Sequence, residues 1–216
     1  MFNKAVRLTG ELFILAGIVI GLWLIYENYG TNLQAATATA NTTAQLEKEW
    51  TTQHNLNVQI NQPFALVYIP RLGHSAWGLP LLEGTGQANL AKGLGHYTDS
   101  QLPGQAGNFA IAGHRVTHGQ PFYDFPKLQS GDLVYVKTGE AIYEYKLFAT
   151  KFVKPSDYYV VSRAPRVALP TDARGFNLLT LTTCDPAWNS YRRWIWWGYL
   201  TAIHSLADDP TVGVTP

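Results

Sequence analysis

The sequence predicts a mainly β domain, either a closed or nearly closed barrel or a sandwich, preceded by one membrane-spanning helix at the N-terminus. About eight short β-rich runs are separated by frequent glycine and proline, with little helical periodicity between them. One long apolar run with basic residues before it precedes these strands. We expect a cytoplasmic tip and anchor at 1–27, a linker with a short helix at 28–59, the β domain at 60–206 and a flexible tail at 207–216.

Composition limits the function classes. Hydrophobic residues make up 46% of the chain and charged residues 14%, with a formal net charge of +1, which suits one globular domain with a packed core. No excess of basic residues is present to attract nucleic acid, so we expect no nucleic-acid partner. The chain has a single cysteine, which excludes an internal disulfide and leaves a free thiol to explain.

The N-terminal apolar run predicts a membrane anchor. Lys4 and Arg7 precede the run 12–26, which as a helix is ~22 Å long against a ~30 Å hydrocarbon core. A span that starts at Leu8 is longer, but it places Glu11 near the headgroups, where it could pair with Arg7. The basic residues on the N-terminal side predict a single-pass protein of the cell membrane with its β domain extracellular. A cleavable signal peptide is the alternative, because A-x-A sites occur at 36–40, and a buried helix of a soluble fold is a second one.

The elements of the β domain follow in order. A short helix is expected at 44–53 and a helical turn at 88–92, and His96 is expected in a turn. Residues 138–140 are expected to link two strands as a tight hairpin. Strand candidates lie at 64–70, 77–82, 108–113, 132–137, 141–152, 177–183 and 194–203.

Cys184 is the first candidate for chemistry. It ends the strand 177–183, directly before Asp185 and Pro186, where the strand must stop. A thiol at a strand end on a barrel rim can ionise and attack a carbonyl carbon. By itself, the position is equally compatible with a small buried hydrophobic residue.

His114 and Arg193 could complete a catalytic group. His114 ends the strand 108–113 and opens a loop, where an imidazole can protonate a leaving amine and later deprotonate an attacking one. A structural turn histidine is the alternative. Arg193 keeps its proton and can donate to a carbonyl oxygen that becomes an oxyanion. Strand alternation points Arg192 the other way, and spacing alone does not decide which arginine faces Cys184.

Three segments in order resemble a known family. Residues 180–184 (TLTTC) resemble the TLxTC signature of sortases, 112–115 (AGHR) resemble their catalytic-histidine segment, and Arg193 stands where the family has its arginine. The resemblance covers residues 60–203. Further matching runs lie at 68–73, 93–97 and 103–108.

The resemblance implies an eight-stranded β-barrel and a cysteine transpeptidase. Such an enzyme cleaves a C-terminal sorting signal between Thr and Gly, forms a thioacyl intermediate on Cys184, and passes the protein to an amine of a peptidoglycan precursor. The segment 114–122 is most like class E, with class D next, which implies secreted partners with an LAxTG or LPxTG signal. Tyr97 and Thr183 would contact the substrate, although each could equally be structural.

Other functions stay open at this stage. We expect no cofactor and no metal, because His114 and His118 share a face only on a helix and this stretch reads as a loop. An exported β-barrel binding module would keep Cys184 buried and unreactive. A cysteine hydrolase on the same barrel would use water in place of an amine, and a degenerate sortase would do neither.

Overall fold

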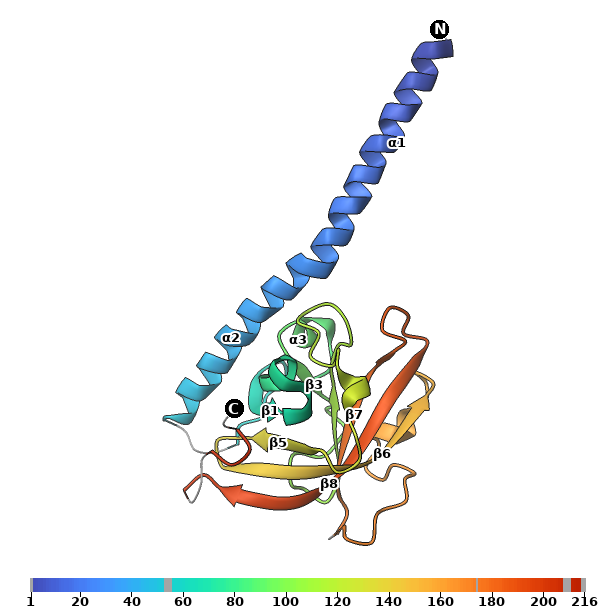
Figure 1. Ribbon diagram of the computed structural model, residues 1–216. Coiled ribbons are helices and arrows are strands. Elements are labelled where there is room, and N and C mark those ends of the chain that lie inside the picture. Colours follow the sequence, from blue (N-terminus) through green and yellow to red (C-terminus); the bar gives the residue numbers. More distant parts are fainter. Residues whose placement is uncertain (1, 53–55, 174, 208–210, 215–216) are drawn as a thin grey trace.

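A closed β-barrel forms the body of the protein, and one long helix extends away from it (Figure 1). The computed structural model describes residues 2–52, 56–173, 175–207 and 211–214. The barrel order is β1-β2-β3-β4-β7-β8-β6-β5, closed by pairing of β1 with β5. The predicted eight-stranded barrel is therefore confirmed.

Two pairs of neighbouring strands in the barrel are parallel, β2 with β3 and β4 with β7, and the others are antiparallel. The strands are β1 (Pro63–Tyr68), β2 (Trp77–Glu83), β3 (Leu94–His96), β4 (Gly107–Ala112), β5 (Leu133–Lys137), β6 (Ala141–Val153), β7 (Asn177–Asp185) and β8 (Arg192–Ser205). The helical elements are α1 (Phe2–Ile25), η1 (Tyr26–Gly30), α2 (Thr31–Trp50), η2 (Pro70–Ala76), α3 (Gln87–Leu90), η3 (Phe125–Lys127) and η4 (Tyr158–Val161). The strand β3 was not predicted from the sequence, because its three residues are too few to show an alternation of apolar and polar side chains.

Aromatic and branched side chains fill the barrel interior. Phe64, Phe109 and Tyr145 are almost completely buried in the largest apolar cluster. The Tyr145 hydroxyl accepts a hydrogen bond of 2.8 Å from the Gly104 amide, and burial raises the pKa of Tyr145 well above its usual value. The core therefore holds the loop 98–106 at one end of the barrel.

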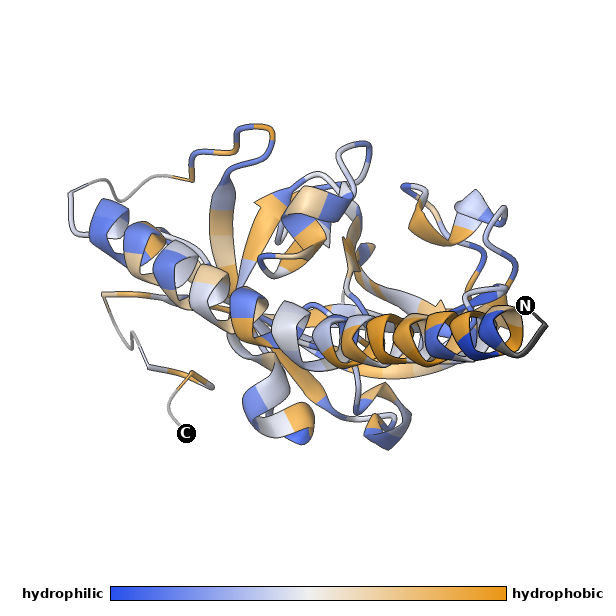
Figure 2. Ribbon diagram, turned by 90° about the horizontal axis from the view of Figure 1, so that it is seen from above, coloured by the Kyte–Doolittle hydropathy of each residue, from blue (hydrophilic) through white to orange (hydrophobic). Residues whose placement is uncertain are grey.

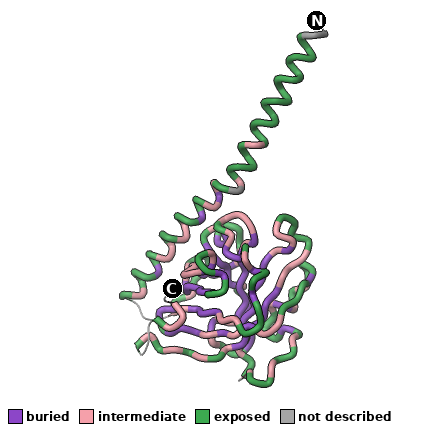
Figure 3. The backbone as a smooth tube through the Cα atoms, in the orientation of Figure 1, coloured by how far each residue is buried: buried purple, intermediate pink, exposed green. Residues whose placement is uncertain are grey.

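Helix α1 has the length and hydropathy of a membrane span. The most apolar 18-residue window within residues 4–25 has a mean hydropathy of 2.2, and none of this window is buried against the protein. The orange of hydrophobic residues runs along α1 in Figure 2, and Figure 3 shows the same helix exposed. Twenty-two residues of helix span ~33 Å, enough for a bilayer core. The expected pair of Arg7 with Glu11 forms at 2.8 Å.

The expected linker is largely a helix. Residues 31–50 form α2, which continues α1 through the π-helical turn η1. The short helix expected at 44–53 is confirmed over 44–50 as the end of α2, and the rest of α2 was not predicted because threonine and alanine give this segment almost no apolar stripe. Thr31, Ala35 and Leu46 nevertheless face the barrel at helical spacing and are buried. Two further α2 hydroxyls donate to barrel carbonyls, so docking stabilises the helix. These are Thr39 Oγ1 to Lys92 O (2.8 Å) and Thr43 Oγ1 to Gly78 O (3.3 Å).

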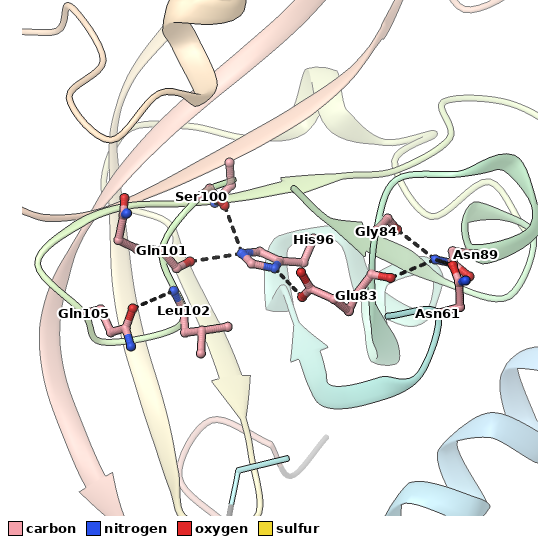
Figure 4. Close-up of polar contacts among 10 residues, drawn as sticks. Asn61, Glu83, Gly84, Asn89, His96, Ser100, Gln101, Leu102 and Gln105 are labelled. Carbon is pink, nitrogen blue, oxygen red and sulfur yellow. Dashed lines mark hydrogen bonds and ion pairs between the residues drawn. The ribbon is translucent and has the colours of Figure 1, made fainter. Parts of the chain in front are cut away.

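The expectation that His96 lies in a turn is wrong. His96 belongs to β3 and is 1% exposed, with Nδ1 2.6 Å from the Glu83 carboxylate and Nε2 2.9 Å from the Ser100 hydroxyl (Figure 4). The order carboxylate, imidazole, hydroxyl is that of a catalytic triad. However, Ser100 is buried and its oxygen also accepts the Ala110 amide at 3.1 Å. The cluster therefore joins β2, β3 and β4 inside the fold.

The C-terminal segment is partly packed against the barrel. Residues 211–214 form a turn in which Val212 and Val214 contact the cluster around Tyr135. Residues 208–210 and 215–216, which belong to the expected flexible tail, lie outside the described residues, as do residues 53–55 of the expected linker.

Candidate active site

The ends of β4 and β7 bring His114 and Cys184 together. These parallel strands pair from Gly107 with Asn177 up to Ala112 with Thr182. His114 and Cys184 each lie two residues beyond that last pair. Because partners in a ladder are ~4.8 Å apart and every second residue shares a face, the two side chains emerge side by side. Cys184 is half-buried, as a thiol that must meet a substrate needs to be.

Thr183 fixes the distance between the two strand ends. Its hydroxyl is buried and donates to the Gly113 carbonyl at 2.9 Å, and the Gly113 amide donates to the Thr182 carbonyl at 3.1 Å. A Cβ at position 113 would lie 2.7 Å from the Phe122 ring, so only glycine allows this approach. The Thr183 hydroxyl, expected to contact substrate, is engaged within the fold and directly links the residues before Cys184 and His114.

The β7–β8 register decides between the two arginines. Cys184 pairs with Arg193, and Asp185 pairs with Arg192. Directly opposed residues of an antiparallel ladder share a face, so Arg193 lies on the Cys184 side. Arg193 Nη1 donates to the Ser190 and Arg192 carbonyls at 2.8 and 3.2 Å. These bonds leave three of the five guanidinium N–H groups for another acceptor.

A charged network occupies the other face of the same strand ends. Asp185 is buried and accepts a hydrogen bond from Arg192 Nε, while Arg115 Nη1 lies 3.6 Å from its second oxygen. Arg115 also donates to the Tyr123 carbonyl at 3.2 Å and lies over the Trp194 ring at 5.3 Å. The residue after His114 is thereby tied to the residue after Cys184. The sequence reading missed this network, although an arginine and an aspartate directly after the two candidates were visible.

His114 lies in a poorly solvated environment. Its Nε2 atom is buried, and it has no hydrogen-bond partner within the part of the chain that the structure describes. The His118 ring stacks on it with centroids 5.0 Å apart and an interplanar angle of 25°. Burial lowers the pKa of His114, and repulsion from a charged His118 lowers it further. The imidazole is therefore mainly neutral near pH 7, and its protonated form is a stronger acid than usual.

Tyr97 lies on the Cys184–Arg193 side of the site. Its hydroxyl is 3.1 Å from Thr182 Oγ1, and Tyr97, Thr182 and Arg193 line one small cavity of about 50 Å³ with the segment 153–161. Tyr97 is half-exposed, so its ring can contact a bound chain. A thiol, an imidazole and a guanidinium thus come from neighbouring strand ends, and these are groups that can serve acyl transfer.

Comparison with known proteins agrees with this arrangement. The model of the sortase domain family matches residues 67–201. The chain is 33% identical to Sortase SrtE1 of Streptomyces coelicolor over 90% of its own length and 29% identical to Sortase SrtE2 of the same organism over 96%. It spans 56% of the first relative and 87% of the second. The solved structure of sortase E from Streptomyces avermitilis superposes with a TM-score of 0.63 and 40% identity, covering 73% of this chain and 99% of that one.

Proposed function

Because the chain belongs to the sortase family of cysteine transpeptidases, we propose that it cleaves a C-terminal sorting signal of the LAxTG or LPxTG type between Thr and Gly. The acyl group would pass through Cys184 to an amine, with a peptidoglycan precursor as the natural acceptor. His114 and Arg193 are the other catalytic residues of the proposal, and Tyr97 contacts the signal. Thr183 serves this site by holding the strand ends together.

In the first half of the reaction, the Cys184 thiolate attacks the threonine carbonyl carbon. A C–S bond forms and the carbonyl oxygen becomes an oxyanion, which the Arg193 guanidinium stabilises. The C–N bond then breaks, and protonated His114 gives its proton to the nitrogen of the departing glycine. The products are a thioester on Cys184 and a peptide with a free amino terminus.

In the second half, an acceptor amine attacks the thioester carbonyl. Neutral His114 takes a proton from the attacking nitrogen, Arg193 again stabilises the oxyanion, and the Cys184 thiolate leaves. The lowered pKa of His114 favours this neutral form at pH 7. The result is a new amide bond, and the starting protonation state returns.

The observation that best supports this function is the pairing at the strand ends. Cys184 lies opposite Arg193 across β7 and β8, and His114 leaves the neighbouring β4 at the same level. A core role for the cysteine, as in a binding module, needs neither partner. The apolar helix α1 supports a single membrane span. The basic residues before this span favour an N-terminus in the cytoplasm and a β-barrel on the outer side of the membrane.

Mass spectrometry of the full-length protein in detergent tests the proposal. The protein is incubated with LAxTG and LPxTG peptides and an amine, beside Cys184→Ala as the control. We expect a ligated product from the wild type and none from the variant, with an acyl adduct on the Cys184 peptide. Cleavage without ligation would indicate a hydrolase. If neither peptide forms an adduct on Cys184, and the thiol does not react with alkylating reagents, a binding module would be indicated.

A further inference from the structure

The loop after His114 has an unusual backbone. Thr117, His118 and Gln120 have φ angles of 64°, 48° and 52°, and Gly119 between them has φ of 83°. Residues other than glycine rarely adopt this left-handed backbone conformation, and a β-branched threonine does so least readily. Four consecutive residues of this kind persist only where the surroundings hold them in place.

Helix α2 supplies one of the contacts that hold the loop. The Gly119 amide donates to Asn32 Oδ1 at 2.9 Å, 87 positions apart in the chain. Ala35, one turn further along α2, is buried and would lie 3.4 Å from a Cβ at position 119. Within the loop, the Phe122 amide donates to the His114 carbonyl at 3.0 Å and closes it. The segment that begins at His114 is therefore fastened to the helix that continues the apolar span.

The loop in turn places one imidazole on another. His118 Nδ1 lies 2.9 Å from Thr117 Oγ1, which orients the ring that stacks on His114 at 5.0 Å. His118, Gly119 and Asn32 also line a groove of about 710 Å³ between α2 and the barrel. One side of the His114 ring is thus covered by a residue that the strained loop positions.

We propose that Asn32 and His118 are positioning residues for the reaction: α2 holds the strained loop through Asn32, and the loop holds the His118 ring against His114. This inference rests on the proposed role of His114 in proton transfer. These contacts couple the membrane-proximal helix α2 to the active site. If α2 is loosened, the His118 ring moves away from His114, and the His114 ring can then rotate and contact water. Misplacing a catalytic group by ~1 Å can cost up to about 100-fold in rate.

Several charged groups surround the pair and bear on its titration. Glu47 of α2 and His74 of η2 line the groove that contains His118. Cys184 and Arg193 lie at the strand ends beside His114. Removal of the His118 ring, or hydration of the His114 ring, would raise the pKa of His114 toward its usual 6.5.

The test uses full-length protein in detergent with ¹⁵N-labelled histidine, whose ring resonances are assigned with single His→Gln variants. The variants are Asn32→Ala, Asn32→Asp, which keeps an accepting oxygen, and His118→Phe, which keeps a ring without a charge. Thr39→Val is the matched control, because it removes another α2-to-barrel hydrogen bond that does not involve the loop. The pKa of His114, kcat and the peptide KM are measured for each.

Asn32→Ala and His118→Phe are expected to raise the pKa of His114 toward its usual value, because each removes the repulsion from a charged His118. For Asn32→Ala we expect kcat to fall about three- to tenfold with KM within about twofold, while Asn32→Asp and Thr39→Val stay near the wild type. An unchanged pKa and kcat in Asn32→Ala would overturn the inference, as would an equal effect of Thr39→Val. If the wild type transfers no peptide, the proposed function fails, and the His114 titrations alone decide whether the loop positions the ring. If Asn32→Ala does not fold, His118→Phe decides.

Discussion

Replacing Asp185 by asparagine removes the carboxylate that joins the two strand ends of the site. In the folded protein this carboxylate lies between Arg115 and Arg192, with side-chain exposures of 10% for Asp185 and 9% for Arg115. Arg115 Nη1 has no hydrogen-bond partner among the described residues, and Asp185 is the opposite charge that it faces at 3.6 Å. Asp185→Asn therefore leaves a buried guanidinium without its counter-charge.

The cost can be worked out from the contacts that remain. Removing one partner of a fully buried ion pair costs about 3–5 kcal/mol. Here Arg115 keeps its hydrogen bond to the Tyr123 carbonyl and its cation–π contact with the Trp194 ring. The asparagine can still accept a hydrogen bond from Arg192. We therefore expect a loss of about 2–3 kcal/mol. For a chain of this size, that corresponds to a fall in Tm of about 4–12 °C.

Thermal unfolding followed by near-ultraviolet circular dichroism measures this fall, because the tryptophans of β8 report the packing of the barrel. Arg192→Gln is the matched control: its side chain is 40% exposed, so its loss should cost no more than about 1 kcal/mol. The double variant Arg115→Met with Asp185→Asn should lose less than the two single variants together, since it removes both charges. A Tm within about 1 °C of the wild type for Asp185→Asn, or an equal loss in Arg192→Gln, would refute this reasoning.

Three further predictions concern the site itself. Arg193→Gln should lower kcat about 100- to 1,000-fold with the peptide KM within about twofold, and a raised KM with unchanged kcat would show a binding role only. Tyr97→Phe removes the 3.1 Å hydrogen bond to Thr182 and should change kcat/KM for LAxTG and LPxTG peptides by up to about tenfold. Thr182→Val also removes the 3.2 Å hydrogen bond to the Ile111 carbonyl, so its effect and that of Tyr97→Phe should be less than additive in the double variant, and full additivity would contradict a shared bond. Because the folded pKa of His114 lies below 6.5, the unfolded chain binds that proton more readily, and the free energy of unfolding should fall as pH drops from 6.5 through the folded pKa. His114→Gln should flatten the pH dependence of urea midpoints in this window, and identical slopes would contradict it.

The strands could be predicted because most of them carry their signal locally, but that signal left both a barrel and a sandwich open, and the eight-stranded barrel was implied by the family resemblance. Alternating or continuous apolar runs such as 64–70 and 132–137 are bounded by glycine or proline and became β1 and β5. Two of the wrong predictions have a common cause. Helix α2 and His96 depend on partners distant in the chain: α2 on the carbonyls of Gly78 and Lys92, and His96 on Glu83 across the parallel β2–β3 pair.

The candidate site was predicted as residues, and its geometry was not. The motifs identified His114, Cys184 and Arg193. However, the separation of 70 positions between His114 and Cys184 in the sequence does not tell how close the two residues lie in space. Pairing of β4 with β7 supplies that distance, and it depends on closure of the whole barrel. The contribution of α2 through Asn32 could not be found either, because a single asparagine in a threonine-rich segment has no local signature.

The register of β7 against β8 separates two tasks that would conflict on one face. In the proposed reaction, Arg193 presents a positive charge to the oxyanion, and a neighbouring carboxylate would neutralise that charge. Asp185 follows Cys184 directly, yet strand alternation points it to the opposite face, where it forms ion pairs with Arg115 and Arg192. In the described part of the chain no carboxylate pairs with Arg193. A slip of β8 by one residue would exchange the two arginines, so that Arg192 would lie on the Cys184 face and Arg193 would face Asp185. The ion pairs on the far face thus stabilise the register that leaves Arg193 on the Cys184 face, where the proposed reaction needs it.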